Sequence, residues 1–148
     1  RAVAVLDRAH AQLERHHRAA QRRELLLVGV GLLHLFVGAA LACGGEVEGI
    51  RLLSEEGVNT ILEEQIRGID LIFGVPMVFG MGFGLNDASF PISPNPRSFF
   101  WGGWGGSLAI IDLDARVSIA YVMNRMEANL MGDPRGASIA QAVYESLA

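Results

Sequence analysis

Residues 99–126 read FFWGGWGGSLAIIDLDARVSIAYVMNRM, and this stretch decides the expected fold. Two apolar runs, residues 107–111 and 117–123, flank a short polar turn at residues 112–115. In the second run the apolar side chains alternate to one side, as in a strand with one buried face; they are Val117, Ile119, Tyr121 and Met123. The stretch therefore predicts an antiparallel pair of strands joined by a hairpin.

A helix is expected at the C-terminal end of the sequence. Asp133 can cap its first turn, and Pro134 fits its first position. Ile139, Val143 and Leu147 repeat at helical spacing and would form the buried stripe. We therefore expect this helix to lie on the sheet.

A second helix is expected upstream, where Ser54 can act as the N-cap and two glutamates occupy the first turn. Gly68 is well placed to stop this helix. The apolar stripe that predicts it consists of Val58, Ile61, Leu62 and Ile66.

A glycine-rich strand is expected between the two helices. From Met77 to Leu85, apolar side chains alternate with Gly80, Gly82 and Gly84, which predicts one strand with a bare face. Residues 86–98 contain three prolines and predict a surface loop. The order of elements indicates the α+β class, with an antiparallel sheet and flanking helices.

The N-terminal part of the chain differs from the rest. Residues 1–24 hold six arginines and three acids, whereas the remainder is acidic. From Leu25 to Ala42 the chain is apolar or small except for His34. This run, residues 25–42, is just long enough to cross a bilayer. A histidine in lipid is costly, so a soluble helix is the favoured interpretation and a membrane association through this run is the alternative.

Composition excludes several functions. The 148 residues include twelve arginines and no lysine, and the net charge is −4, which argues against nucleic-acid binding. The single Cys43 cannot form an internal disulfide and is expected to be a small core residue. His10, Glu14 and His17 share one helical face, but such spacing on a polar helix indicates a solvated face, so no metal and no cofactor are expected.

From about residue 39 onward the chain is similar to the last third of class C-like serine hydrolases, the group of serine β-lactamases and family VIII carboxylesterases. Trp101, Gly102 and Gly103 stand where β-lactamases carry Lys-Thr-Gly, and a Gly-Gly-Ser entry to the next strand follows. The resemblance implies the C-terminal part of a β-lactamase/transpeptidase-like domain over residues 39–148. Residues 1–38 would form a divergent segment, basic and then apolar, of helical character.

The resemblance also implies one wall of a cleft for a small ester or amide substrate, made by Trp101, Gly102, Gly103 and Trp104. Glycines at a strand edge let a substrate approach the backbone, and a backbone N–H there can complete an oxyanion hole. By the family pattern this donor is the amide of Trp104. The repeated Trp-Gly-Gly leaves Gly103 as the alternative.

The attacking groups of that family are missing from this chain. Its Ser-x-x-Lys motif requires a lysine, and neither Tyr121 nor Tyr144 begins a Tyr-x-Asn motif. No catalytic residue is therefore assigned, and we expect the chain to be inactive unless an upstream portion completes it. The alternative is a membrane-anchored or degenerate remnant that acts by association, and the expected location is cytoplasmic or, with that alternative, membrane-associated.

Other polar residues have plainer explanations. Ser107 lacks the second glycine of a Gly-x-Ser-x-Gly elbow and is expected to begin a strand. Asp112 and Asp114 lie at the hairpin tip, where turn preference explains them better than acid-base chemistry. The glycines near residue 30 and those at 80–84 do not form a dinucleotide-binding loop.

Overall fold

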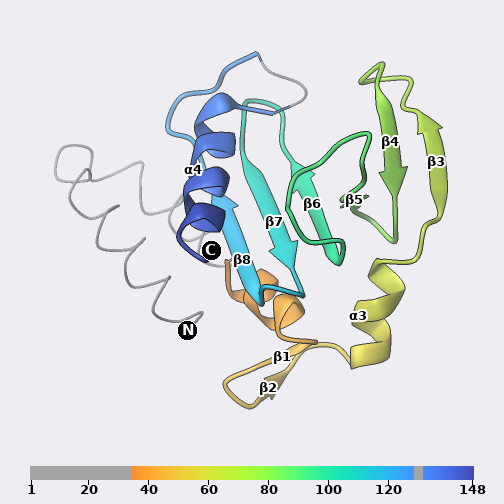
Figure 1. Ribbon diagram of the computed structural model, residues 1–148, viewed down its shortest axis with the longest axis vertical. Helices are drawn as coiled ribbons and strands as arrows, with labels where there is room; N and C mark the ends of the chain where they lie inside the picture. The colour runs from red at the N-terminus through yellow and green to blue at the C-terminus, as the bar shows by residue number, and fades with distance from the viewer. Residues whose placement is uncertain (1–34, 129–131) are drawn as a thin grey trace, which may run out of the picture.

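The computed structural model describes residues 35–128 and 132–148, which form a six-stranded antiparallel sheet with flanking helices (Figure 1). The α+β class is thereby confirmed. The six strands follow one another across the sheet in sequence order: β3 (Ile66–Ile69), β4 (Pro76–Phe79), β5 (Gly84–Leu85), β6 (Ser98–Gly102), β7 (Leu108–Asp112) and β8 (Val117–Tyr121). A separate ribbon pairs β1 (Glu46–Val47) with β2 (Ile50–Arg51), and the helical parts are residues 35–42, α3 (Glu55–Ile61) and α4 (Pro134–Glu145).

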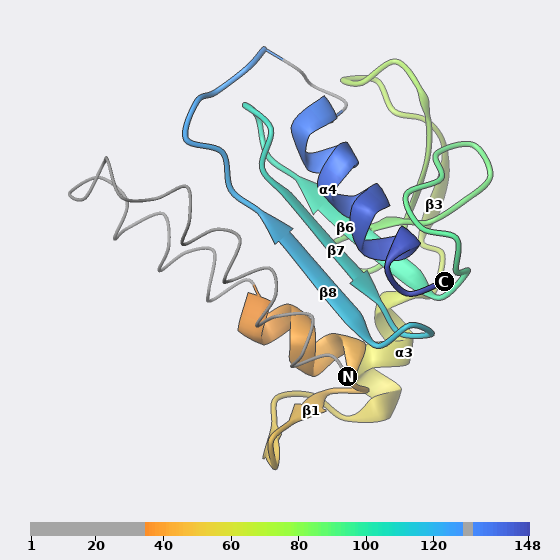
Figure 2. The same ribbon diagram turned by 60° about the vertical axis from the view of Figure 1, so that its left-hand side comes forward.

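Each face of the sheet is covered by its own apolar cluster. One cluster joins residues 35–42 and α3 to the sheet around Phe99, which is fully buried. The other contains Phe100 and Ile110 and lies under α4, which runs along this face of the sheet in roughly the same line as β7 and β8 (Figure 2). Phe99 and Phe100 serve opposite clusters because successive side chains of a strand point to opposite faces.

The hairpin and the start of the last helix are as predicted from the sequence. β7 and β8 pair over their full lengths, from Leu108 opposite Tyr121 to Asp112 opposite Val117. Asp133 caps α4 by accepting a hydrogen bond from the backbone N–H of Arg135 at 2.9 Å.

The predicted buried stripe of α4 is wrong at two of its three positions, since only Val143 packs against the cluster under the helix. Ile139 and Leu147 are 42% and 43% exposed, and the buried positions are Gly136 and Ala140. A Cβ at Gly136 would meet the Tyr121 ring at 3.0 Å. The helix therefore turns small residues to the sheet, because only they allow so close an approach.

The upstream helix begins as predicted but ends early. The Ser54 hydroxyl accepts the N–H of Gly57 at 3.0 Å, yet α3 stops at Ile61. Ile66 and Gly68 belong to β3 instead, where Ile66 lies opposite Phe79. Pairing with β4 satisfies the backbone of these residues, and it leaves Ile66 63% exposed.

The single strand predicted for residues 77–85 is two strands. A turn closes between them, with the Gly80 N–H donating to the Phe83 carbonyl at 2.9 Å and Gly82 at a φ of 82°. A Cβ at Gly80 would overlap the carbonyl of Ile61 at the end of α3. The glycines thus serve a turn and a close approach, although alternation alone indicated a bare strand face.

Several predictions fall on residues outside the described part of the chain. These include the His10, Glu14 and His17 face and most of the apolar run at residues 25–42. Over residues 35–128 and 132–148, no helix is long and apolar enough to cross a membrane, and no three His, Cys, Asp or Glu side chains gather as metal ligands. Cys43 is half-buried instead of fully in the core.

Two glycines of the β1–β2 region offer a matched test of backbone strain. Gly45 and Gly49 both have positive φ, 95° and 78°, but only a Cβ at Gly45 would overlap a neighbour, the Leu53 carbonyl. We expect Gly49→Ala to lower the free energy of unfolding by about 1 kcal/mol and Gly45→Ala by about 3 kcal/mol. Urea denaturation followed by far-UV circular dichroism measures both, and equal losses would contradict the overlap at Gly45.

Candidate active-site wall

The Trp101–Gly103 segment lies where β6 ends and turns toward β7. The ladder between the two strands runs to Gly102 opposite Leu108. Beyond it, the Gly103 N–H donates to the Ser107 carbonyl at 2.9 Å, and the Gly106 N–H donates to the Gly103 carbonyl at 3.0 Å. Residues 103–106 therefore form a tight turn, which we call the oxyanion turn because the family resemblance predicts an oxyanion donor there.

One edge of β6 is open beside this turn. β5 pairs with β6 only at Leu85 opposite Phe99 and Gly84 opposite Phe100. Within the described part of the chain, Trp101 and Gly102 are thus paired only on their β7 side. An extended substrate could lie along this edge, as a peptide adds to an exposed strand.

The two candidate oxyanion donors differ in their hydrogen bonds. The amide of Gly103 is used within the hairpin, at the Ser107 carbonyl. The amide of Trp104 donates to no acceptor among the described residues. A donor that has no acceptor among the described residues is better prepared for a developing negative charge. Of the two candidate amides, that of Trp104 meets this condition.

The two tryptophan rings differ in their surroundings. Trp101 is 48% exposed and packs on Phe79, with ring centroids 6.3 Å apart. Trp104 is 69% exposed. Trp101 is therefore the more fixed of the two side chains at this edge.

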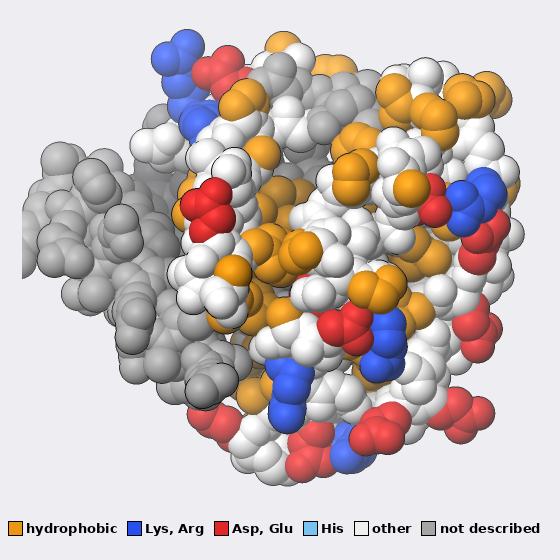
Figure 3. Space-filling model, viewed as in Figure 1, with side chains coloured by type: hydrophobic (Ala, Val, Ile, Leu, Met, Phe, Trp, Pro, Cys, Tyr) orange, Lys and Arg blue, Asp and Glu red, His pale blue; other side chains and the backbone are white. Residues whose placement is uncertain are grey.

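An apolar groove of about 550 Å³ begins at the same edge and runs beside α4. Figure 3 shows hydrophobic side chains gathered in the furrow between α4 and the middle of the molecule. Trp101, Gly102 and Gly103 line it, and Trp104 does not. The sequence did not indicate this groove, because its other walls come from residues 90–94 and from the small residues of α4.

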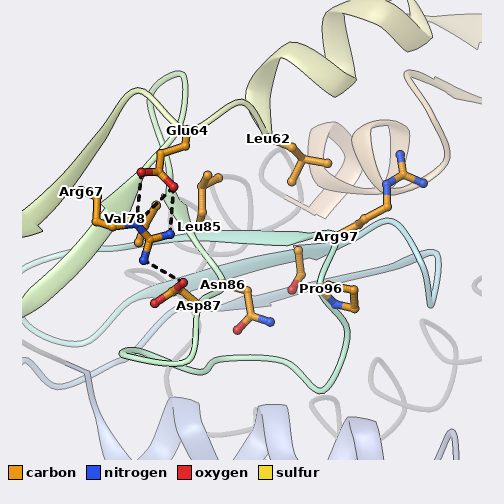
Figure 4. Close-up of a pocket in the computed structure, with 10 residues that line it drawn as sticks. Leu62, Glu64, Arg67, Val78, Leu85, Asn86, Asp87, Pro96 and Arg97 are labelled. Atoms are coloured by element: carbon orange, nitrogen blue, oxygen red, sulfur yellow. Dashed lines mark hydrogen bonds and ion pairs between the residues drawn. The ribbon is translucent and has the colours of Figure 1, made fainter.

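A second, smaller pocket of about 270 Å³ lies on the other side of the loop after β5 (Figure 4). There the Arg67 guanidinium bonds to the carboxylates of Glu64 at 2.8 Å and Asp87 at 3.1 Å. Hydrogen bonds from the hydroxyl and amide of Ser89, with a further one from Arg67, lower the pKa of Asp87 to about 2. The one guanidinium pairs with both carboxylates, and the pKa of each is lowered, so this cluster fixes β3 to the loop and offers no group that titrates near neutral pH.

Asp112 is buried and belongs to a structural network. Its Oδ2 accepts hydrogen bonds from the Ser93 hydroxyl at 2.7 Å, the Asn95 amide at 2.9 Å and the Tyr144 hydroxyl at 3.0 Å, and its Oδ1 accepts from the Ala115 N–H at 2.8 Å. Burial favours the neutral acid, but these donors outweigh it and lower the pKa of Asp112. Asp112 therefore ties the proline loop, the hairpin and α4 together.

Ser107 is not equipped as a nucleophile. Residues 35–148 contain no histidine and no lysine, so neither of these bases can take its proton from within that part of the sequence. Its side chain instead packs beside Gly103, where a Cβ would overlap the hydroxyl. Ser107 therefore serves the hairpin, as its position at a strand start indicated.

The comparisons with known proteins decide the lineage. The family described as Beta-lactamase matches residues 14–144. The chain belongs to this family. A solved family VIII carboxylesterase is 39% identical, with a TM-score of 0.70 over 76% of this chain and 30% of that one. A penicillin-binding protein homolog from Caulobacter crescentus is 37% identical, with a TM-score of 0.72 over 76% and 30% of the two chains.

A third solved structure, EstA from Arthrobacter nitroguajacolicus Rue61a, is 30% identical, with a TM-score of 0.61 over 75% of this chain and 30% of that one. No curated protein matches the chain. The chain thus spans about a third of the length of these relatives. The resemblance to β-lactamases and family VIII carboxylesterases, inferred from about residue 39 onward and most specifically from residues 99–125, is confirmed.

Proposed function

We propose that this chain forms one wall of the substrate cleft of a serine hydrolase that acts on small esters or amides. Trp101, Gly102 and Gly103 would hold the substrate along the open edge of β6, and the amide of Trp104 would stabilise the oxyanion. Among the described residues the Trp104 N–H has no acceptor and lies beside an unpaired strand edge, and this observation carries the proposal. Family membership supplies the reaction class.

The proposed wall works only with a nucleophile supplied by another portion of polypeptide. The sequence contains no lysine for Ser-x-x-Lys and no Tyr-x-Asn. An oxyanion donor stabilises the tetrahedral intermediate but cannot form it. We therefore propose that the chain is inactive by itself.

A chimera tests whether this chain supplies the cleft wall and an upstream portion supplies the nucleophile. Residues 39–148 would replace the corresponding C-terminal part of the similar family VIII carboxylesterase, and hydrolysis of p-nitrophenyl butyrate and nitrocefin would be measured. We expect no turnover by the chain alone and turnover by the chimera, which should fall at least about 10³-fold when the Ser-x-x-Lys serine of the upstream part is replaced by alanine.

Two outcomes would contradict the proposal. Turnover by the chain alone that a serine-directed phosphonate blocks would show that the nucleophile is present. A folded chimera that binds no substrate would remove the cleft wall. The alternative, a membrane-anchored remnant, rests on residues 25–42, most of which lie outside the described part of the chain.

A further inference from the structure

The oxyanion turn consists mostly of glycine, which does not restrict its own backbone to one conformation. Three of its four residues are glycine, and Gly105 and Gly106 have φ values of 101° and 113°. Glycine gives a chain the freedom to adopt such angles and equal freedom to leave them. Catalytic donors, however, need to be held within about 0.5 Å of the productive position. Something outside the turn must therefore restrain it.

The segment after β8 restrains Gly105. The Glu127 N–H donates to the Gly105 carbonyl at 3.1 Å. On the other side, a Cβ at Gly105 would lie 2.7 Å from the terminal methyl of Met126 and 3.2 Å from that of Met123. The turn is thus packed tightly against residues 123–127, which leaves no room for a side chain at Gly105.

The N-terminus of α4 restrains Gly106. A Cβ at Gly106 would overlap the Asp133 carboxylate, whose side chain is 1% exposed. Figure 1 shows the tip of the β6–β7 hairpin beside this end of α4. The buried carboxylate therefore forms the surface on which the turn rests.

Arg135 holds that carboxylate in place through several hydrogen bonds. Its Nε donates to Asp133 Oδ1 at 2.8 Å and to Oδ2 at 3.0 Å, and its Nη2 also bonds to Oδ2. The same Nη2 donates to the Arg125 carbonyl at 2.9 Å. Arg135 thus joins the two segments that hold the turn, residues 123–127 and the start of α4.

Helix capping alone does not explain this arrangement. The cap needs only the Asp133 carboxylate and the backbone N–H of Arg135, at 2.9 Å. The guanidinium fork and its bond to Arg125 add nothing to that cap. They do fix the orientation as well as the position of the Asp133 carboxylate, against which Gly106 packs, because a forked pair restrains both.

We propose that the Asp133–Arg135 pair is a positioning device that holds the oxyanion turn, and with it the Trp104 N–H, in the geometry required for catalysis. Its catalytic role rests on the proposed function. Both residues would act as positioning residues, through the turn and not on the reacting atoms. The Arg135 guanidinium lowers the pKa of Asp133, so the pair stays charged throughout the neutral range.

The first test concerns the full chain alone and needs no activity. Backbone 15N relaxation would be recorded for the unchanged chain, Arg135→Ala and Asp133→Ser; serine keeps a capping hydroxyl but removes the carboxylate. We expect the heteronuclear NOE of residues 103–106 to fall in both variants while that of α4 stays unchanged. Arg51→Ala is the matched control, because it breaks an exposed ion pair with Glu46 far from the turn.

The second test uses the chimera and separates positioning from stability. We expect Arg135→Ala to lower kcat about 10- to 100-fold with KM within about twofold. The affinity for an arylboronic acid, whose adduct places an oxygen in the oxyanion hole, should fall by the same factor. Arg135→Lys, which restores charge without the fork, should recover only part of the loss.

The outcomes distinguish this proposal from the function on which it rests. Unchanged relaxation at residues 103–106 in both variants would overturn the positioning role whatever the chimera does. An inactive but folded chimera would overturn the proposed function. The relaxation result would then decide by itself whether the Asp133–Arg135 pair holds the turn. Equal losses of kcat for Arg135→Ala and Arg51→Ala would also overturn positioning, because they would reflect general destabilisation.

Discussion

Replacing Trp104 by proline in the chimeric hydrolase should lower kcat by about 10²- to 10³-fold, the usual effect of losing one oxyanion donor. Proline removes the backbone N–H and nothing else that the turn requires. Among the described residues the Trp104 amide has no acceptor to lose, and Trp104 does not have a positive φ. The preceding Gly103 tolerates the backbone restriction that proline imposes.

Trp104→Ala is the matched control, because it removes the exposed indole and keeps the amide. We expect its kcat to stay within about threefold of the parent chimera. The kinetics would be compared at a saturating concentration of p-nitrophenyl butyrate, with circular dichroism to verify folding. Equal losses in the two variants would assign the effect to the side chain, and full activity of Trp104→Pro would exclude this amide as the donor.

Asp112→Asn should be the most damaging single substitution in the polar network, with a loss of about 3 kcal/mol in the free energy of unfolding. Its carboxylate accepts four hydrogen bonds and is fully buried. The NH2 of an asparagine would face an N–H donor, that of Asn95 or that of Ala115, which it cannot satisfy. Urea denaturation followed by circular dichroism would measure the loss.

The neighbouring Asp114→Asn is the control for that substitution. Asp114 accepts a hydrogen bond from the backbone N–H of Arg97 at 3.0 Å, but it is partly exposed and its ion pair with Arg97 is long, at 3.9 Å. We expect it to cost less than about 1 kcal/mol. Similar costs at the two positions would show that the Asp112 network contributes little to stability.

Asp112 also sets a pH dependence. Its pKa is lowered on folding, so its contribution is present above the unfolded value of about 3.9 and is lost as the pH falls through the lower folded value. Stability should therefore decline from about pH 5 downward. In Asp112→Asn this acid decline should be shallower, because the substituted side chain does not titrate.

Local signals in the sequence predicted the hairpin and both helix starts. Ser54, Asp133 and Pro134 act within one helical turn, so their effect can be read without the tertiary structure. The end of α3 could not be read in this way. Ile66 continues a helical stripe, but its backbone pairs with Phe79, and that pairing depends on the fold of the following residues.

Part of the candidate site could be proposed from the sequence for the same reason. A contiguous motif carries Trp101 to Trp104, and its repeat left the proposed donor open between two amides. The hydrogen bond from Gly103 to Ser107 supports Trp104 as the proposed donor, and no sequence pattern could indicate that bond. The support by Asp133 and Arg135 was missed because it joins a turn to residues about thirty positions later. The glycines at 105 and 106 were its only signal.

The placement of Trp101 and Trp104 gives the protein a built-in optical reporter. These are the only two tryptophans in the sequence, and they stand on either side of Gly102 and Gly103. The Trp104 indole is largely in water and Trp101 lies against an aromatic ring, so their emission should differ in wavelength and in quenching by acrylamide. Intrinsic fluorescence therefore reports almost entirely on the proposed cleft wall, and ligand binding there can be titrated without a label.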